Sequence, residues 1–225
     1  MKKEPVLKTK RLVISCMNND EIRELIDSCS DESLRSAYEE MQKGAIENEL
    51  FRKWYAPWKI CRKTDGIMVG NLCFMGEPKN DAVEVGYGLF PEYEGNGYMT
   101  EALESVLNWA FGCGEGVYFI EAETDAENTR SQKILKSLGF VPDGEGEEGP
   151  RFVKETEEGH YLSIGICLGM CIGVSLGTAF HNIAIGLAFG IGIGTLFGVM
   201  VDKKNKERIK KAREKRKTEK KQENL

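Results

Sequence analysis

The sequence predicts a mixed α/β domain, in which helices flank a central sheet, followed by a two-helix transmembrane hairpin and a basic helical tail. Stretches with strand-like alternation and stretches with helical spacing of apolar residues take turns over residues 1–160. Residues 161–201 contain no Asp, Glu, Lys or Arg, and residues 202–225 carry 12 basic against 5 acidic side chains. We therefore expect three parts, with these residue ranges.

The first elements of the domain are expected to be a strand, two helices and a pair of strands. "VLKTKRLVISCM" has the alternation of an opening strand, and "NNDEIRELIDSC" places Asn and Asp cap candidates before apolar residues at helical spacing. A longer, mostly polar helix is expected from Asp31 to Trp54. "WKICRKTDGIMVGNLCFMG" then indicates two strands joined by a turn at residues 64–66.

The remainder of the domain alternates strands with helices. Strands are expected in "AVEVGYGLF", which Pro91 ends, in "GVYFIEAET" and in "RFVKE". Between them, "TEALESVLNWAF" and "NTRSQKILKSLGF" have the apolar spacing of helices, and Gly139 is a C-cap candidate for the second one. Because strands and helices alternate, the predicted class is a mixed α/β sheet.

The residue counts exclude two common kinds of site. The chain has only two histidines, His160 and His181, and both lie outside the expected globular core. The first 159 residues therefore lack the usual base of a serine or cysteine hydrolase. None of the seven cysteines belongs to a C-x-x-C pair, so we expect no metal site.

Cysteine use and charge indicate a cytosolic domain. Cys16, Cys61 and Cys73 stand in apolar stretches, as reduced core thiols do, and no apolar signal region follows the N-terminus. Residues 1–160 carry 19 basic against 31 acidic side chains, within a net charge of −5 for the chain. An acidic domain, with a tail that has no aromatic residue for base stacking, does not favour nucleic acid as a partner.

The uncharged segment is long enough for two membrane spans. About 20 helical residues cover roughly 30 Å, the thickness of a hydrocarbon core, and this segment has 41 residues with His181-Asn182 near its middle. Glycine recurs every fourth residue in both halves, at 165, 169, 173 and 177 and at 186, 190, 194 and 198. Such stripes indicate close packing of two backbones, within one chain or between chains of a homo-oligomer. A soluble buried helical pair and a low-complexity linker are the alternatives.

The basic tail predicts the orientation of the chain in the membrane. A polybasic run directly after a span is typical of the cytoplasmic side, and two spans return the chain to the side from which it entered. The domain and the tail are therefore both expected in the cytoplasm, with the tail near anionic membrane lipids. The alternative is a solvated charged helix with no further role.

The loop "YEGNGYMTEA" joins a predicted strand to a predicted helix through two glycines one residue apart. This arrangement aims several unpaired N–H groups and the positive end of the helix at one point, which suits a pyrophosphate. It is not the dinucleotide fingerprint, because no third glycine follows at the required spacing. A simple strand-to-helix turn is the alternative.

Three ordered segments resemble the GNAT acyltransferase superfamily, most closely its branch of ribosomal-protein N-terminal acetyltransferases. They are "TKRLVI", "VEVGYGLFPEYEGNGYMTEAL" and "AENTRSQKILKSLGF", and the resemblance covers about residues 8–155. It implies acetyl-CoA as the acetyl donor, with its pantetheine arm between the strands that end near Phe90 and Thr124. The implied cofactor-binding residues are Leu89, Phe90, Gly95, Asn96, Gly97, Tyr98, Met99, Asn128 and Ser131.

Two positions depart from the pattern of the family. Glu92 stands where the family prefers Gln or Arg, which removes a phosphate donor. Leu135 stands where many members have a Tyr that protonates the departing CoA sulfur. Ser131 matches the serine that substitutes for this tyrosine in the branch, and the resemblance implies that it hydrogen-bonds the sulfur.

A primary ammonium must lose a proton before it can attack a thioester, so the reaction needs a base. We expect Glu84 in this role, because strand alternation places it on the same side as Gly86 and Gly88. Glu121 on the neighbouring strand is the second candidate, and a merely solvent-facing Glu84 is the alternative.

The sequence as a whole predicts a membrane-tethered N-acetyltransferase whose acceptor is an amine, either a small molecule or a protein N-terminus or lysine. The acidic domain favours a cationic acceptor. Trp54, Tyr55 and Trp58 are expected either to flank the acceptor or to belong to the core. Two other functions stay open: a non-catalytic CoA-binding module, and a membrane-interaction protein that acts through its hairpin.

Overall fold

The computed structural model describes residues 4–157, 161–179 and 181–223, and it divides into two compact units. Unit 1 comprises Met1–Glu155 and unit 2 comprises Thr156–Leu225. Each unit is described by itself. Of the two histidines, His160 lies outside the described residues.

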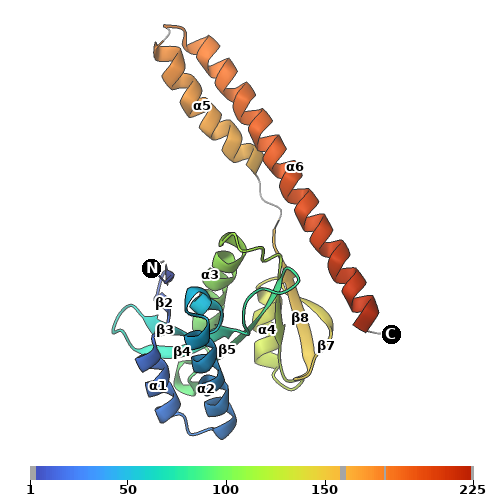
Figure 1. The fold of residues 1–225 in the computed structure, drawn as a ribbon. Coiled ribbons are helices and arrows are strands. Elements are labelled where there is room, and N and C mark those ends of the chain that lie inside the picture. The colour runs from blue at the N-terminus through green and yellow to red at the C-terminus, as the bar shows by residue number, and fades with distance from the viewer. Residues whose placement is uncertain (1–3, 158–160, 180, 224–225) are drawn as a thin grey trace. The chain divides into compact units, whose positions relative to one another are not determined.

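Unit 1 contains an eight-stranded sheet with the strand order β1-β2-β3-β4-β5-β6-β8-β7 (Figure 1). All neighbouring strands are antiparallel except β5 and β6, which are parallel. The strands are β1 Val6–Lys8, β2 Leu12–Cys16, β3 Trp58–Arg62, β4 Met68–Phe74, β5 Ala82–Leu89, β6 Phe119–Glu123, β7 Val141–Glu145 and β8 Pro150–Glu155.

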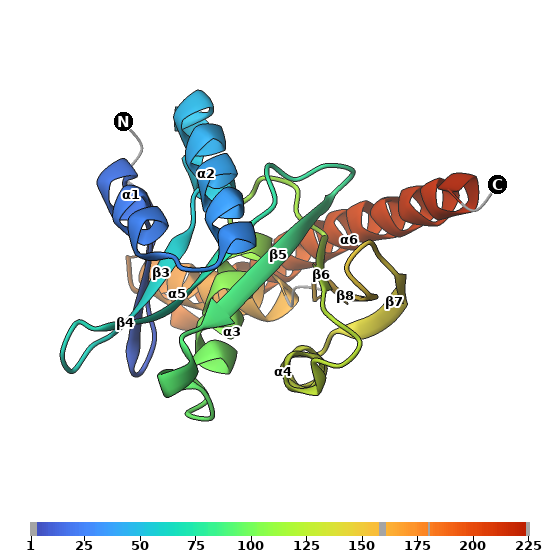
Figure 2. The same cartoon turned by 90° about the horizontal axis from the view of Figure 1, so that it is seen from below.

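Four α-helices cover the two faces of this sheet. Figure 2 shows α1 and α2 on one side of the sheet and α3 and α4 on the other. The helices are α1 Asn19–Ser28, α2 Glu32–Glu47, α3 Tyr98–Gly112 and α4 Thr129–Ser137, with short 3₁₀ helices η1 Glu49–Trp54 and η2 Pro91–Tyr93. The mixed α/β class and the flanking helices are therefore as predicted.

The main core lies between the sheet and α3, whose apolar face is fully buried. Trp54 and Trp58 are 0% exposed and pack with Phe74 and Trp109, at ring-centroid distances of 4.8–6.3 Å. An aromatic side chain of this size stabilises the fold far more when it is buried in the core than when it is exposed to solvent. Of the two expectations for Trp54 and Trp58, membership of the core is therefore confirmed, and a place beside the acceptor is not.

Three predicted elements of unit 1 need correction. The single opening strand is two antiparallel strands, β1 and β2, because Thr9 turns the chain and bonds back to the Leu12 carbonyl. The long helix expected from Asp31 to Trp54 ends at Glu47 and continues as η1. Strand β7 was not predicted, since "VPDGE" contains Pro and Gly and owes its extended form to pairing with β8.

Strands β5 and β6 separate part of the way along their length. They pair only over residues 82–84 and 119–121, after which β5 runs on to Leu89 and β6 to Glu123 without pairing with each other. A gap between two parallel strands leaves unpaired main-chain groups on both. A ligand with amide groups can bond to such strand edges.

Unit 2 is an antiparallel pair of helices, α5 (Tyr161–Ala179) and α6 (Ile183–Glu223), visible in Figure 1. Both are long and apolar enough to cross a membrane, and only 22% and 17% of their apolar windows are buried in the structure. A buried pair in a soluble core would be mostly covered, so this alternative is not supported. Helix α6 continues without a break from the apolar segment into the basic tail.

The two glycine stripes face each other within the chain. A Cβ atom added at Gly173 would lie 2.6 Å from the carbonyl oxygen of Gly186, and one added at Gly169 would overlap the carbonyl of Gly190. All eight stripe glycines meet the backbone of the opposite helix in this way. The structure therefore pairs the stripes within one chain.

Polar contacts close both ends of the hairpin. The Asp202 carboxylate accepts bonds from the main-chain amides of Tyr161 and Leu162 at 2.8 and 3.0 Å, which satisfies the first donors of α5. At the turn, His181 adopts a left-handed φ of 54°, and the Asn182 side chain accepts from the Ile185 amide. The register of the glycine stripes is thus held from both ends.

We predict that Gly173→Leu separates α5 from α6 and that Gly192→Leu does not. The first substitution places a side chain against the Gly186 backbone, whereas nothing lies within 4 Å of a Cβ at Gly192. Electron–electron double resonance between spin labels at positions 164 and 196, in nanodiscs and in a background without the seven free cysteines, measures the separation. Parent and Gly192→Leu should give one narrow, short distance and Gly173→Leu a broad, longer one. Equal distributions for both variants would contradict glycine-mediated packing.

Candidate active site

A cleft of about 330 Å³ opens in unit 1 beside the end of β5. One wall is the loop that leads into α3, and the other is the first turn of α4. Its lining residues are Tyr87, Gly88, Leu89, Glu94, Gly95, Gly97, Met99, Thr100, Asn128, Arg130, Ser131 and Ile134. Six of the predicted cofactor-binding residues line the cleft: Leu89, Gly95, Gly97, Met99, Asn128 and Ser131. The predicted Phe90, Asn96 and Tyr98 adjoin it without lining it.

The loop before α3 takes a conformation that requires its glycines. Gly95 and Gly97 have φ angles of 76° and 72°, a left-handed region that side chains disfavour. The Asn96 side chain donates to the carbonyls of Tyr93 and Glu94, both at 3.1 Å, and ties the loop into a compact turn. Gly97 is the N-cap of α3 and offers no side-chain cap, so the first amides of the helix stay available to an anion.

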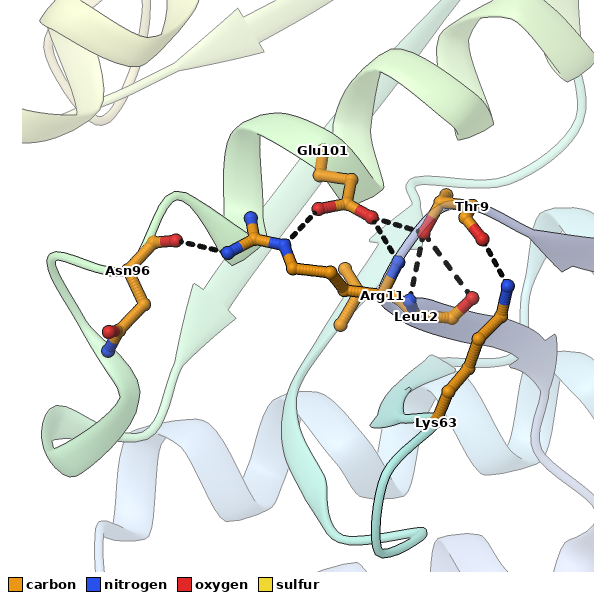
Figure 3. Close-up of polar contacts among 6 residues, drawn as sticks. All are labelled: Thr9, Arg11, Leu12, Lys63, Asn96 and Glu101. Carbon is orange, nitrogen blue, oxygen red and sulfur yellow. Dashed lines mark hydrogen bonds and ion pairs between the residues drawn. The ribbon is translucent and has the colours of Figure 1, made fainter.

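Arg11 lies directly before β2 and contacts this loop, as Figure 3 shows. Its guanidinium donates to the Asn96 carbonyl oxygen at 2.9 Å and to the Glu101 carboxylate at 2.6 Å, and it lies 4.7 Å from the Tyr98 ring centre. Because a trans peptide points its C=O and N–H in opposite directions, a fixed Asn96 carbonyl turns the Gly97 amide away from Arg11. Arg11 therefore sets the direction of one of the loop's donors.

The Glu101 carboxylate holds Arg11 in place through further hydrogen bonds. It also accepts from the Thr9 hydroxyl at 2.6 Å and from the Arg11 main-chain amide at 2.8 Å. Burial favours a higher pKa for Glu101, but the bonds from Thr9 and Arg11 outweigh it and hold the pKa below its usual range. The carboxylate thus stays charged and keeps Arg11 in place. Sequence reasoning missed Arg11, which stands 85 residues before Asn96 and carries no local signal of this contact.

The opposite wall of the cleft begins at Asn128. Its side chain caps α4 by accepting from the Ser131 amide at 3.0 Å, and the cap does not use its NH₂ group, which is a donor. The Ser131 hydroxyl lies 2.7 Å from the Tyr87 hydroxyl. Arg130, which the sequence reasoning did not single out, forms an ion pair with Glu94 and joins the two walls. The acid beside the glycines is therefore directed at Arg130.

The predicted base and its alternative lie side by side, but they do not line the cleft. Glu84 and Glu121 are partners in the register of β5 and β6, at the last paired position before the strands separate. Val83 and Val85 are buried against the core, so alternation places Glu84 on the face of the sheet opposite to α3 and α4. Glu84 is half-buried.

Burial, and then the charges of Glu123 and Glu121, raise the pKa of the Glu84 carboxyl above its ordinary value, against an opposing effect of Arg151. For Glu123, burial also favours a higher pKa, but bonds from the Glu148 amide at 3.1 Å and from Arg151 at 2.8 Å hold the pKa below its usual range. Neighbouring carboxyls with opposite shifts provide one proton acceptor of raised basicity beside fixed negative charge.

Two cysteines of the sheet are poor nucleophiles. Burial raises the pKa of the Cys16 and Cys73 thiols to about 12, so neither forms the thiolate needed by a nucleophile at neutral pH. Within residues 4–157, 161–179 and 181–223, no group of three or more His, Cys, Asp or Glu side chains is placed to hold a metal ion.

Comparison with family models gives two matches in different parts of the chain. A model described as an acetyltransferase (GNAT) domain matches residues 10–141. A model described as a glycine zipper membrane protein matches residues 155–204. The two matches correspond to the α/β unit and to the glycine hairpin.

Single proteins and solved structures resemble the α/β unit. The uncharacterized N-acetyltransferase YjdG of Bacillus subtilis (strain 168) is 31% identical over 106 residues, which span 47% of this chain and 62% of that protein, just under two thirds. The ribosomal-protein-S5-alanine acetyltransferase of Vibrio fischeri matches 68% of this chain and 98% of its own, with a TM-score of 0.56 and 16% identity. The ribosomal L7/L12 α-N-protein acetyltransferase RimL in complex with coenzyme A matches 67% and 98%, with a TM-score of 0.54 and 16% identity. At such identities the structures establish the fold alone.

We predict that Arg11→Ala increases the backbone mobility of residues 95–99, because the Asn96 carbonyl loses its partner. The ¹⁵N order parameters of these residues should fall from about 0.85 to roughly 0.6 or below. Arg11→Lys should give intermediate values, since an ammonium cannot bond the Asn96 carbonyl and Glu101 as a planar fork. Arg23→Ala is the matched control, because Arg23 is exposed and forms its ion pair with Asp20 on its own helix. Parent-like order parameters in Arg11→Ala would show that Arg11 does not hold the loop.

We also predict that Glu84→Gln raises the thermal stability of unit 1 at pH 7 and leaves it nearly unchanged near pH 3. The folded-state pKa of Glu84 is raised, so between the unfolded and folded values the folded state binds more protons, and stability falls as pH rises through this window. At pH values above the folded-state pKa, the charged Glu84 carboxylate destabilises folded unit 1. Glutamine cannot ionise and removes this effect. Fluorescence of the three tryptophans, all in unit 1, monitors unfolding. The exposed Glu104→Gln is the control, and an equal gain at both pH values would refute the assignment.

Proposed function

Since a GNAT model covers residues 10–141, the chain belongs to the GNAT acetyltransferase family, and we propose that it transfers an acetyl group from acetyl-CoA to a primary amine at the cytoplasmic face of a membrane. The observation that carries the proposal is the loop of Gly95 and Gly97 at the head of α3. Its left-handed glycines and uncapped helix amides suit the diphosphate of coenzyme A.

The residues around the cleft fit the remainder of acetyl-CoA. Beyond the paired positions, β5 has main-chain groups from Gly86 to Leu89 on the edge that faces β6, and the amides of a pantetheine arm match such an edge. The Asn128 NH₂ group provides a further donor from the opposite wall. Met99 and Ile134 supply apolar lining, which excludes water from the arm.

Glu84 is the proposed base. A primary ammonium has a pKa of about 10, and a carboxylate of raised basicity accepts its proton more readily than an ordinary one. The neutral amine then attacks the thioester carbon, a C–N bond forms, and the nitrogen releases its second proton to solvent. CoA leaves with the electron pair of the C–S bond. Glu121, the register partner of Glu84, is the alternative base and otherwise adds negative charge that attracts the ammonium.

The acceptor is proposed to be a cationic amine. Acidic side chains surround Glu84 on β6 and in the loop before β8, among them Glu121, Glu123 and Glu148. Negative potential raises the local concentration of cations and steers them to the site. Protein N-termini, lysines and small amines all fit this requirement, and two of the structural neighbours are described as acting on ribosomal proteins.

The hairpin is proposed as the membrane anchor. Its outward side chains are apolar and exposed, for example Phe189 at 67% and Leu196 at 74%, which suits contact with lipid tails. The basic residues of α6 follow the apolar segment directly, so the positive-inside rule places the tail in the cytoplasm. Two spans place the α/β unit on the same side, where acetyl-CoA is made. A purely membrane-active role would need no cleft with these donors in unit 1.

One observation favours a non-catalytic CoA-binding module as the second candidate. Leu135, which stands where many family members have a tyrosine acid, is 0% exposed and belongs to the core. It can neither protonate a thiolate nor approach the cleft. Catalysis therefore needs another proton donor near the sulfur.

The proposed function is tested with membrane vesicles that contain the full chain. Acetyl-CoA does not cross bilayers, so inside-out vesicles should acetylate externally added amines, scored by mass spectrometry, and right-side-out vesicles should do so only after detergent is added. Glu84→Gln should lower kcat by about 10²-fold with little change in the KM for acetyl-CoA, and the exposed Glu104→Gln should match the parent. Bound CoA without any acetylated amine would support the binding module, and activity in intact right-side-out vesicles would reverse the orientation.

A further inference from the structure

The cleft contains a hydroxyl group that can replace the missing acid at Leu135. Three of its lining residues carry hydroxyls, namely Tyr87, Thr100 and Ser131. Two of these, Tyr87 and Ser131, form a hydrogen bond of 2.7 Å across the cleft, from β5 to α4. A phenol and an alcohol that share a proton beside a thioester site are suited to proton transfer.

The sheet fixes the position of Tyr87. It pairs with Leu72 in the register of β4 and β5, and its ring packs against the main core. Alternation places Tyr87 on the α4 side of the sheet, whereas Glu84, three residues earlier on the same strand, lies on the other side. The gap between β5 and β6 begins between these two positions. A thioester in this gap would therefore have the base on one side and the phenol on the other.

The Tyr87 hydroxyl keeps its proton at neutral pH. Burial raises the pKa of Tyr87 above its ordinary value of about 10, although the bond to Ser131 works in the opposite direction. Ser131 is itself positioned, because the Asn128 cap holds its amide at 3.0 Å. When the Ser131 hydroxyl donates to the phenol oxygen, the phenol proton is held by a long bond of 3.5 Å to the Ser131 carbonyl. A ligand atom at a shorter distance can replace this acceptor.

We propose that Tyr87 is the catalytic residue that donates a proton to the CoA sulfur, with Ser131 as its positioning residue. The inference rests on the proposed acetyl transfer. As the C–S bond breaks, the sulfur takes its electron pair and the proton of the Tyr87 hydroxyl, and CoA leaves as a thiol. The phenolate accepts a hydrogen bond from Ser131 and regains a proton from water. Ser131, for which the family resemblance implied a contact with the sulfur, acts in this account through Tyr87.

The test measures the pKa of the thiol of bound CoA, which requires no knowledge of the acceptor. The full chain in detergent is saturated with CoA or with desulfo-CoA, which lacks the thiol, and the difference in thiolate absorbance is followed against pH. A donor at the sulfur stabilises the thiolate, so the parent should show a thiol pKa about one unit below the ordinary value of roughly 8.5. Tyr87→Phe should restore the ordinary value, while its affinity for desulfo-CoA stays equal to that of the parent.

Two further variants separate the alternatives. Tyr118→Phe, on a tyrosine outside the cleft, should match the parent. Ser131→Ala should raise the thiol pKa by less than Tyr87→Phe does. A full shift in Ser131→Ala with none in Tyr87→Phe would make Ser131 the donor and overturn the proposal. Equal thiol pKa values in parent and Tyr87→Phe would overturn it and leave acetyl transfer intact, whereas a parent that binds no CoA would overturn the proposed function as well.

Discussion

The direction of the main-chain amides at the head of α3 is the constraint on which the rest of unit 1 depends. Left-handed Gly95 and Gly97 turn the chain, no side chain caps the helix, and Arg11 fixes the peptide between Asn96 and Gly97. The donors for an anion belong to the backbone, so no side chain of the loop has to bind the anion. Acidic side chains in the loop can therefore point away from it. Glu94 is drawn to Arg130, and Glu92 is exposed.

Strand β5 connects this loop to the chemistry. It ends at the loop, carries Glu84 on one face and Tyr87 on the other, and separates from β6 between them. Along its length, this strand carries first the proposed proton acceptor Glu84, then the start of the open edge, and then the proposed proton donor Tyr87. The hairpin of unit 2 uses glycine for a different purpose, since its stripes allow two helix backbones to touch. It is the proposed membrane anchor.

Local patterns in the sequence predicted the features that are formed locally. The Asn18 capping box starts α1, the glycines mark the loop, and the period of four residues identifies the facing stripes of α5 and α6. What the sequence could not show depends on long-range contacts. Strand β7 is extended because β8 pairs with it, and Arg11 and Tyr87 reach the site through the sheet. No spacing in the chain relates Tyr87 to Ser131, 44 residues later.

The most direct measurement of the central claim is a titration of the loop amides by nuclear magnetic resonance. The protein is labelled with ¹⁵N at glycine and methionine, and coenzyme A is compared with pantetheine, which has the same arm but no diphosphate. The account predicts that CoA moves the amide proton resonances of Gly97 and Met99 downfield, as strong hydrogen bonds to phosphate do, and that pantetheine does not. Unmoved resonances with CoA, or equal movement with both ligands, would contradict it.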